Sequence, residues 1–308
     1  MRRYENVRIL VFGAGAMGSF FGGLLSKRNR VTLVGRPDHM RAVRERGLRI
    51  TGKTALLATP ATATRLPANL EPDLVIVTTK AYDTEAAMQP LRLYAGSALF
   101  LTLQNGLDNP EIIARTAARV LAGTTSHGVT FTAPGEVHHA GAGDTVIGGW
   151  SNVDEADLVR VRDVFEEASI PTRLTSDVRR ELWAKVVVNA SINPLAALAG
   201  VPNGRLLKDK RLLATLETVC REAVAVARAD GAALDPTEIL RRTIVVARRT
   251  ATNRSSMLQD FDRGRRTEID AITGAVVRAA ERHRVAVPAN GVLYALVRAR
   301  EAALLRPS

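Results

Sequence analysis

Residues 7–18 read Val7-Arg8-Ile9-Leu10-Val11-Phe12-Gly13-Ala14-Gly15-Ala16-Met17-Gly18, a mainly apolar run that ends in G-x-G-x-x-G. The run predicts a β-strand, and the apolar residues from Met17 onward predict a helix. In this pattern Gly13 permits a tight turn, Gly15 lets a pyrophosphate approach the backbone, and Gly18 lets the helix pack closely on the strand. The helix N-terminus also favours an anion. The stretch therefore predicts a dinucleotide-binding site.

The next strand indicates which dinucleotide is bound. Val31–Val34 reads as this strand, and Gly35-Arg36 follows it. An acidic residue at this position would hold the ribose 2′-hydroxyl of NAD, whereas an arginine pairs with the 2′-phosphate of NADP. No residue between Val31 and Pro37 is acidic. Arg36 therefore favours NADPH as the cofactor, and a solvated loop arginine is the alternative.

Strand-like runs and helical segments alternate through the first half of the chain. We predict strands over 7–12, 31–34, 73–79, 98–103, 120–129, 136–147 and 172–174, a peripheral hairpin over 47–51 and 55–58, and a helix over 154–168. Such alternation is typical of an α/β fold, with a mostly parallel sheet and helices on both faces. We therefore expect a Rossmann-type nucleotide-binding domain over residues 1–176.

The second half of the chain has a helical period almost throughout. We predict helices over 178–199, 209–230, 235–251, 268–284 and 289–305. Asp235-Pro236 and Pro288 have the composition of helix starts. We expect residues 177–308 to form an all-helical substrate domain.

The strongly basic composition does not by itself indicate a nucleic-acid-binding protein. The 308 residues carry a net charge of +12, and the 43 basic residues comprise 37 Arg and six Lys. They are scattered through amphipathic helices, and few aromatic residues accompany them for base stacking. We expect no nucleic-acid partner, and part of the charge would attract an anionic cofactor and substrate.

The sequence predicts a cytoplasmic protein without a membrane partner. We find no apolar run of the length needed to span a bilayer, and Met1–Glu5 leads directly into the first strand without room for a signal peptide. The single Cys220 excludes an internal disulfide. His127 and the neighbouring pair His138 and His139 form no ligand cluster, because successive strand residues point to opposite faces. We expect no metal site.

A buried helix in the second half carries regularly spaced polar residues. Helix 179–200 is mostly apolar, yet Lys185, Asn189 and Asn193 recur at i, i+4 and i+8, which places them on one face. A buried lysine is costly unless it is paired or used, and a lowered pKa lets it act as an acid or base. The pattern favours a catalytic face, with a structural polar seam as the alternative. Pro194 should disturb the helix at this point.

A second polar segment follows at a junction between loop and helix. It contains Asn253, Ser255 and Ser256, and Thr267-Glu268 then begins an apolar helix. Serine hydroxyls and backbone N–H groups at such a junction can hold a carboxylate. Equally, the serines could be helix caps and Glu268 a first-turn acid that matches the helix dipole. The residues alone leave these interpretations balanced.

Taken together, the motifs resemble those of the ketopantoate reductase (2-dehydropantoate 2-reductase) family over nearly the whole chain. The matching segments are Gly13–Gly18, Thr79–Thr84, Leu103–Asn109, Glu136–Gly141, Trp183–Asn193, Asn203-Gly204, Ser255–Asp260 and Thr267–Asp270. The resemblance implies an enzyme that reduces ketopantoate to pantoate with NADPH, a step towards pantothenate and coenzyme A. It also implies a helical domain similar to the C-terminal domain of 6-phosphogluconate dehydrogenase.

The resemblance implies a role for each matching site residue. Lys185 would be the catalytic proton donor to the ketone oxygen, and Glu268 its partner acid. The implied substrate-binding residues are Asn105, Asn189, Asn193, Asn203, Asn253 and Ser256, of which Ser256 would bind the carboxylate. The implied cofactor-binding residues are Gly13, Ala14, Gly15, Ala16, Met17 and Gly18, then Lys80 and Asn105 near the nicotinamide, and Arg36 at the 2′-phosphate.

Alternatives to this interpretation concern the substrate, catalysis and oligomeric state. A reductase of the same family could act on a different 2-keto acid or related carbonyl compound. A cofactor-binding sensor would lack the lysine or the acid, and this chain has both Lys185 and Glu268. The amphipathic C-terminal helices could cover the core or join two subunits, so a homodimer stays open.

Overall fold

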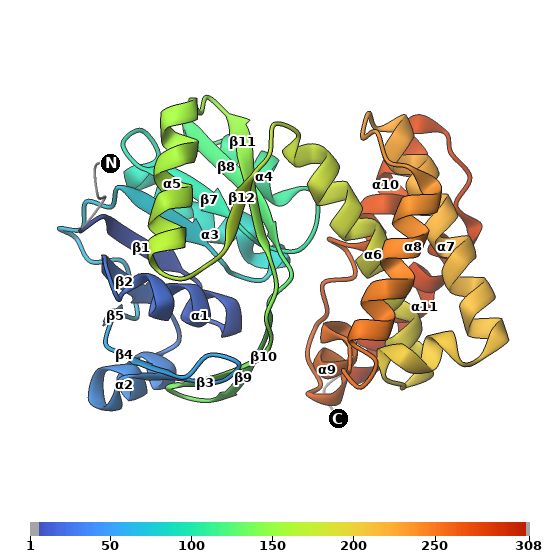
Figure 1. Ribbon diagram of the computed structural model, residues 1–308, viewed down its shortest axis with the longest axis horizontal. Helices are drawn as coiled ribbons and strands as arrows, with labels where there is room; N and C mark the ends of the chain where they lie inside the picture. Colours follow the sequence, from blue (N-terminus) through green and yellow to red (C-terminus); the bar gives the residue numbers. More distant parts are fainter. Residues whose placement is uncertain (1–5, 306–308) are drawn as a thin grey trace. The chain divides into compact units, whose positions relative to one another are not determined.

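Contacts within the chain divide it into two compact units (Figure 1). The structure, a computed structural model, describes residues 6–305. The first unit extends to Gln104 and resumes over Asn109–Val178, and the second unit combines Asn105–Asp108 with the chain from Arg179 onward. The prediction that no signal peptide precedes the first strand concerns Met1–Glu5, which lie outside the described residues.

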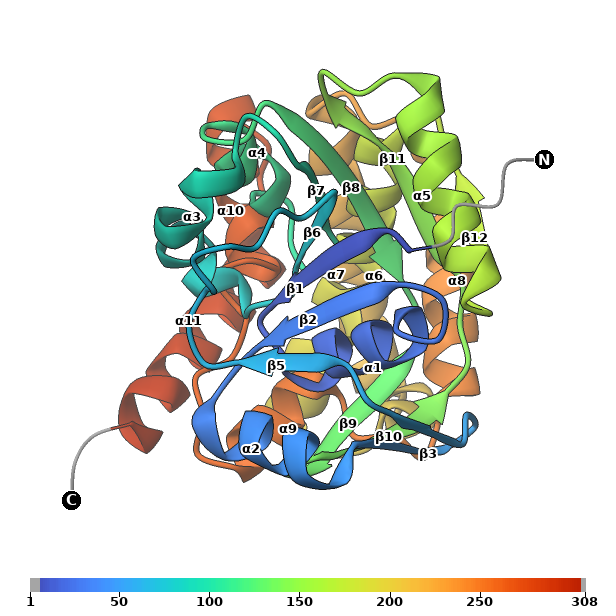
Figure 2. The same cartoon turned by 90° about the vertical axis from the view of Figure 1, so that its left-hand side faces the viewer.

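The first unit is built on a mostly parallel sheet. Within the described residues its eight strands lie in the order β12-β11-β8-β7-β6-β1-β2-β5. The bounds are β1 Arg8–Phe12, β2 Arg30–Val34, β5 Ala61–Ala63, β6 Leu74–Val77, β7 Leu99–Thr102, β8 Arg119–Thr125, β11 Thr145–Ser151 and β12 Thr172–Leu174. Figure 2 shows β1, β2 and β5 side by side. Only β11 against β8 is antiparallel in this sheet, so the predicted α/β fold is confirmed.

Helices cover both faces of this sheet because its central strands are apolar on both sides. Ile9 and Val11 of β1 belong to one core cluster with residues of α1 (Ala16–Leu25) and α5 (Glu155–Glu167). Leu10, which points the other way, belongs to a second cluster with residues of α3 (Thr84–Leu91) and α4 (Asn109–Ala114). The chain enters α3 through a short 3₁₀ turn, η1 (Ala81–Asp83), and leaves it through η2 (Arg92–Tyr94).

A small second sheet accounts for two errors in the predicted strands. It has the order β4-β3-β10-β9, with β3 Leu48–Gly52, β4 Leu56–Ala58, β9 Gly128–Ala133 and β10 Glu136–Gly141. The predicted hairpin is therefore confirmed as β3 and β4. The predicted strands 120–129 and 136–147 are wrong, because each is divided between the two sheets. The division lies where Ser126 and Asp144 exchange hydrogen bonds of 3.0 and 2.9 Å.

The second unit is helical, as predicted. It contains α6 Val178–Ala199, of which Val178 belongs to the first unit, then η3 Asn203–Leu207, α7 Lys210–Ala229, α8 Pro236–Arg249, α9 Ser256–Asp262, α10 Thr273–His283 and α11 Pro288–Leu304. Asp235 caps α8 by accepting the N–H of Glu238, and Pro236 and Pro288 begin their helices as predicted. Trp183 of α6 is buried, and its indole N–H donates to Asp230 at 2.9 Å. This bond joins α6 to the end of α7.

Helix α6 is the buried centre of this unit, and it corrects two predictions. It is long and apolar enough to cross a membrane by length and composition, although no such run was predicted. However, 78% of its most apolar window is buried inside the protein, as in a core helix. The helix also continues through Pro194, where a disturbance was predicted. Ile192, Leu195 and Ala196 are buried in one cluster beside the proline, and this packing holds the helix.

The predicted helix 268–284 starts later than expected. Thr267 and Glu268 lie outside regular structure, residues 269–272 form a turn, and α10 begins at Thr273. The hydroxyl of Thr267 accepts the N–H of Ile269 at 3.1 Å. A side-chain acceptor of this kind competes with the helical hydrogen-bond pattern. Glu268 therefore lies in an irregular segment rather than in the first turn of a helix.

Candidate functional site

The glycine turn lies where the strand order reverses, at the carboxyl ends of β1 and β6, which is the usual ligand position in such sheets. Gly13 has a φ of +103°, and a Cβ there would lie 2.5 Å from the backbone nitrogen of Thr79. A Cβ on Gly18 would overlap the carbonyl oxygen of Gly13. A Cβ on Gly15 would meet nothing closer than 3.9 Å. The two outer glycines thus permit close packing, and Gly15 faces open space that suits a pyrophosphate.

The N-terminus of α1 is left open beside this turn. Gly15 is its N-cap residue, no side chain caps the helix, and its first turn contains no acidic residue. Ala16 and Met17 are half-buried there, whereas Ala14 is buried and its N–H donates to the carbonyl of Val34 at 2.9 Å. An uncapped helix N-terminus without a nearby acid is suited to a phosphate group.

Hydrogen bonds fix the loops that follow β6 and β7. The amide of Gln104 donates to the carbonyl of Thr79 at 2.8 Å and to the hydroxyl of Thr84 at 2.9 Å. Thr84 in turn donates to the side chain of Asn109 at 2.8 Å. Lys80 is half-buried at the start of η1, between two of these anchored residues. Sequence reasoning missed Gln104, because only contacts between distant residues reveal its role.

Arg36 follows the end of β2 by two residues, and its guanidinium lies over an aromatic ring. It is exposed at the N-cap of α2 (Pro37–Arg46), with its guanidinium carbon 5.7 Å from the ring centroid of Phe131 on β9. The ring of His39 packs edge-on against Phe131 at 4.8 Å. Burial, and then the charge of Arg36, lowers the pKa of His39 to about 4. Sequence reasoning missed both His39 and Phe131.

The neutral His39 holds three segments together around this arginine. Its Nδ1 accepts the backbone N–H of Gly135 at 2.8 Å, so its proton is on Nε2. Nε2 then donates to the hydroxyl of Ser19 at 2.8 Å. Helix α1, helix α2 and the turn between β9 and β10 are thereby joined. The Phe131 ring beside Arg36 is consequently held through His39 by residues that are far apart in the sequence.

In the helical unit, Lys185, Glu268 and Asn105 form one electrostatic group. Lys185 is partly buried on α6, and burial lowers its pKa to about 8, although the charge of Glu268 acts in the opposite direction. Glu268 is 8% exposed, and its carboxylate accepts the side-chain N–H of Asn105 at 3.1 Å. A lysine with this pKa can supply a proton near neutral pH. The arrangement is suited to proton transfer at a polarised oxygen.

The loop that carries Asn105 is anchored on α10 and the turn before it. Gly106 has a φ of +105°, and a Cβ there would lie 2.7 Å from the carbonyl oxygen of Ala271. Asp108 accepts a hydrogen bond from Arg278 at 2.6 Å. These contacts explain why Asn105–Asp108 group with the helical unit, although the segment follows a strand of the first unit.

The other predicted substrate-binding residues lie on α6, in η3 and near the start of α9. Asn189 is half-buried and Asn193 is buried on the face of Lys185. The hydroxyl of Ser255 donates to the carbonyl of Asn193 at 3.5 Å and accepts the N–H of Leu258, which makes Ser255 the cap of α9. Ser256 is exposed at the first position of α9.

Asn203 and Asn253 contact each other through the backbone. The backbone N–H of Asn203 donates to the carbonyl of Asn253 at 3.0 Å, and its side-chain amide donates to Thr250 at 2.9 Å. Asn203 Oδ1 is buried without a partner among residues 6–305. Asn253 itself is exposed. The helical unit therefore contains a buried amide oxygen that accepts no hydrogen bond from the described residues.

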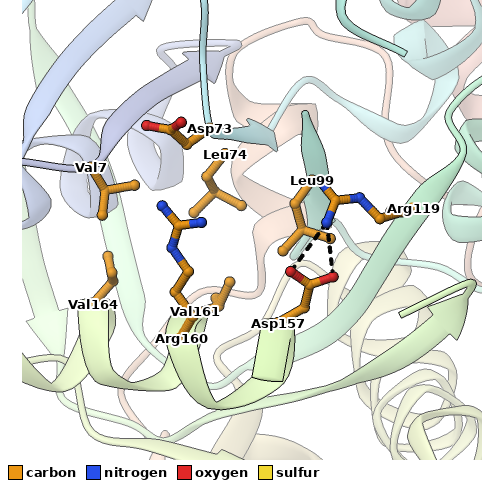
Figure 3. Close-up of a pocket in the computed structure, with 9 residues that line it drawn as sticks. All are labelled: Val7, Asp73, Leu74, Leu99, Arg119, Asp157, Arg160, Val161 and Val164. Carbon is orange, nitrogen blue, oxygen red and sulfur yellow. Dashed lines mark hydrogen bonds and ion pairs between the residues drawn. The ribbon is translucent and has the colours of Figure 1, made fainter. Parts of the chain in front are cut away.

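A small cavity in the first unit lies away from the glycine turn (Figure 3). It is lined by the first residues of the parallel strands, with Leu74 and Leu99 among them, and by Val161 of α5. The ion pair of Arg119 and Asp157, 3.1 Å apart, also lines it. Nucleotides bind at the opposite, carboxyl edge of such sheets, so we assign no ligand to this cavity.

The histidines of the second sheet make contacts that were not predicted. His127 Nδ1 lies 3.1 Å from Nε2 of His139, and Nδ1 of His139 lies 2.9 Å from the hydroxyl of Thr54. His138 instead contacts Thr51 at 3.0 Å. Across the described range, no group of three or more His, Cys, Asp or Glu side chains could hold a metal ion. The histidine pair packs against Phe20 and belongs to the core.

The chain matches two family models. The model described as "Ketopantoate reductase PanE/ApbA" matches residues 9–152, and the model "Ketopantoate reductase PanE/ApbA C terminal" matches residues 177–301. A 2-dehydropantoate 2-reductase of Halobacterium salinarum is 40% identical over 298 residues, which cover 95% of this chain and 98% of the relative. The enzyme of the same name from Pyrococcus horikoshii is 37% identical, with 96% and 98% covered.

Solved structures are similar over the full length. A PanE/ApbA family ketopantoate reductase from Ralstonia eutropha is 32% identical, with a TM-score of 0.89 over 97% of this chain and 99% of that chain. A D-mandelate dehydrogenase in complex with NADH and anilino(oxo)acetate is 27% identical, with a TM-score of 0.91 over 96% and 98%. These similarities identify a pyridine-nucleotide-dependent reductase fold.

The glycine geometry predicts different effects for Gly15→Ala and Gly18→Ala. We expect Gly15→Ala to unfold at the wild-type temperature but to bind a pyridine nucleotide at least about tenfold more weakly, which is about 1.4 kcal/mol, because its methyl group occupies open space at the turn. Gly18→Ala should lower the unfolding temperature, since overpacking costs about 1–3 kcal/mol. Thermal unfolding and calorimetric titration measure both effects.

Gly96→Ala is the matched control, because a Cβ at Gly96 would meet nothing within 4 Å. It should retain both stability and nucleotide affinity. Wild-type affinity in Gly15→Ala would contradict the assignment of the open space to the pyrophosphate.

Proposed function

Since this chain belongs to the ketopantoate reductase family, we propose that it reduces ketopantoate (2-dehydropantoate) to pantoate with NADPH, within pantothenate and coenzyme A synthesis. The observation that carries the proposal is the group of Lys185, Glu268 and Asn105. A partly buried lysine beside an anchored carboxylate is the arrangement that ketone reduction needs. The open glycine turn supports binding of the nucleotide.

We assign Lys185 as the proton donor. A bound nicotinamide would supply the hydride to the ketone carbon. The ammonium of Lys185 stabilises the negative charge that grows on the ketone oxygen and then transfers a proton to it. With a pKa of about 8, the group is mostly protonated at neutral pH and releases its proton more readily than an exposed lysine. Both properties are required of a general acid in this pH range.

Glu268 and the polar residues around it have orienting roles in this proposal. The carboxylate of Glu268 favours the protonated form of Lys185 and accepts the amide of Asn105. Substrate binding is assigned to Asn105, Asn189, Asn193, Asn203, Asn253 and Ser256. The exposed Ser256 hydroxyl, at the start of α9, is suited to the carboxylate of the keto acid, and the buried acceptor of Asn203 is suited to a hydroxyl group.

We propose that the nucleotide binds mainly to the first unit. The turn Gly13-Ala14-Gly15-Ala16-Met17-Gly18 would hold the pyrophosphate, and Lys80 and Asn105 would lie near the nicotinamide. Arg36 would pair with the 2′-phosphate, which makes NADPH the preferred cofactor. The exposed guanidinium on the Phe131 ring supports this role, because no acidic residue accompanies it on the loop.

The proposal includes the domain roles, location and assembly of the protein. Residues 1–176 would bind NADPH, and residues 177–308 would supply the catalytic and substrate-binding groups, apart from Asn105. We propose a cytoplasmic enzyme without a nucleic-acid or membrane partner. A homodimer is the assembly that we propose to test, by measuring the mass in solution.

A different 2-keto acid is the second candidate substrate. The similarity to D-mandelate dehydrogenase, at a TM-score of 0.91, favours it, because that structure contains NADH and anilino(oxo)acetate. D-Mandelate is a 2-hydroxy acid with an aromatic side chain. The same lysine chemistry would serve the corresponding keto acid, so substrate and cofactor must be tested together.

We expect the purified protein to oxidise NADPH in the presence of ketopantoate. A panel should pair ketopantoate, phenylglyoxylate and pyruvate with NADPH and with NADH, and kcat/KM should be highest for ketopantoate with NADPH. Absorbance at the reduced-nicotinamide band measures each rate. Turnover of phenylglyoxylate without turnover of ketopantoate would favour the second candidate.

The proton-donor role of Lys185 predicts a specific pH dependence. Because the protonated amine is the active form, kcat/KM should fall as the pH rises through about 8. Lys185→Ala should lower kcat by about 10²- to 10⁴-fold, the usual range for a general acid. Lys208→Ala, which changes an exposed lysine of the same unit, is the control. Near-wild-type kcat in Lys185→Ala would exclude the role.

The cofactor preference is tested at Arg36. Arg36→Asp should reduce kcat/KM with NADPH and retain activity with NADH, because an acid repels the 2′-phosphate and accepts a ribose hydroxyl. Arg41→Asp, an exposed arginine on the following helix, controls for the change in charge. An unchanged ratio of the two rates in Arg36→Asp would show that Arg36 does not contact the 2′-phosphate.

A further inference from the structure

Glu301 is a buried carboxylate that none of the roles above uses. It lies on α11 and is only 2% exposed. Its Oε1 accepts the backbone N–H of Thr267 at 2.5 Å, and its Oε2 accepts Arg298 at 3.1 Å. A glutamate is rarely buried to this degree unless it is paired. Its partners therefore indicate what it does, and one of them is the residue directly before Glu268.

Helix α11 holds the irregular segment 267–272 on both sides of Glu268. Before Glu268, Glu301 binds the peptide N–H of Thr267. After Glu268, the hydroxyl of Tyr294 donates to Asp270 at 2.8 Å, and Arg298 donates to the same carboxylate at 3.2 Å. Within the segment, the N–H groups of Ala271 and Ile272 donate to the carbonyl of Glu268 at 3.1 Å, which forms a single turn. The contacts from α11 add to this turn and hold the segment at Thr267 and at Asp270.

The position of Glu268 matters because its effect on Lys185 depends on distance. A Coulombic interaction weakens as the charges separate, and the bond from Asn105 to Glu268 has a length of 3.1 Å that a shifted peptide would change. The bound N–H belongs to the peptide that joins Arg266 to Thr267. Rotation of this peptide would shift the backbone that follows, and Glu268 with it. An acceptor that holds the Thr267 N–H therefore limits this movement.

We propose that Glu301 is a positioning residue, which holds the Thr267 peptide and thereby keeps the Glu268 carboxylate beside Lys185. The inference rests on the proposed function, because it assigns Glu301 to the same catalytic group. On this proposal, Glu301 acts through the oxygen that accepts the Thr267 N–H, and its negative charge is less important. Two conservative variants separate these properties.

The experiment compares Glu301→Gln, Glu301→Asp and Glu301→Ala in the full-length protein. Glutamine retains an acceptor at the same reach without the charge, and aspartate retains the charge but is one methylene shorter. Glu222→Ala is the matched control, since Glu222 accepts the N–H groups of Ala289 and Asn290 at 3.0 Å and anchors the other end of α11. One readout is kcat with ketopantoate and NADPH across pH. The other is the pH dependence with which an amine reagent modifies Lys185, followed by mass spectrometry.

We expect Glu301→Ala and Glu301→Asp to lower kcat by about 10- to 100-fold, as small displacements of catalytic groups do. In both, Lys185 should titrate at lower pH, because the raising effect of Glu268 is weakened. Glu301→Gln and Glu222→Ala should titrate as the wild type does. If Glu301→Ala does not fold, the kcat and Lys185 titration of Glu301→Gln are compared with those of Glu301→Asp, and this comparison tests the proposal.

The opposite order, with Asp like the wild type and Gln impaired, would overturn the proposal, and so would an unchanged Lys185 titration in the Ala and Asp variants. An equal change in Glu222→Ala would show only a structural role for α11. If the wild type does not reduce ketopantoate, the proposed function fails, while the labelling experiment still tests Glu301.

Discussion

The burial of one ammonium group is the constraint on which the helical unit depends. Lys185 lies on a helix that is mostly apolar, and its pKa is about 8 instead of the ordinary 10.5. At about 1.4 kcal/mol per pKa unit, holding this charge at neutral pH costs the folded protein roughly 3 kcal/mol. A domain that is stable by about 5–15 kcal/mol retains such a cost only where the charge has a use or a partner.

Glu268 is that partner, and much of the surrounding structure holds it in place. Asn105 binds its carboxylate, Gly106 packs against Ala271, and Asp108 pairs with Arg278. Glu268 lies in the irregular segment before α10, which begins only at Thr273. In the first unit, the glycine turn is likewise held by close packing. A Cβ at Gly13 or Gly18 would overlap neighbouring atoms, whereas Gly15 faces open space.

The sequence predicted those features that are set by local patterns. The alternating burial of Ile9, Leu10 and Val11 gives a strand covered on both faces, and Asp235-Pro236 gives a helix start. Local patterns failed where distant residues decide. The predicted strand 120–129 runs across the Ser126 junction, whose hydrogen-bond partner Asp144 is 18 residues away. The predicted start of the helix at 268 was wrong because the Thr267 hydroxyl accepts the N–H of Ile269, and Thr267 is itself bound by Glu301, 34 residues later.

The candidate site shows the same division. The spacing of Lys185, Asn189 and Asn193 predicted a shared helix face, and the glycine pattern predicted the turn. His39, Phe131, Gln104 and Glu301 had no signal in the sequence, because each acts through contacts with residues distant in the chain. The roles of Asn105 and Glu268 followed from family resemblance, and their mutual hydrogen bond now gives a physical reason to consider them together.

The central claim is that Lys185 gives its proton to the ketone oxygen of the substrate. A crystal structure of the protein with ketopantoate and the oxidised cofactor, which cannot react together, tests it most directly. If Lys185 is the proton donor, its Nζ lies within about 2.6–3.2 Å of the ketone oxygen, with the Glu268 carboxylate beside it. A ketone oxygen bound by another donor, with Lys185 beyond hydrogen-bonding distance, would exclude Lys185 as the proton donor.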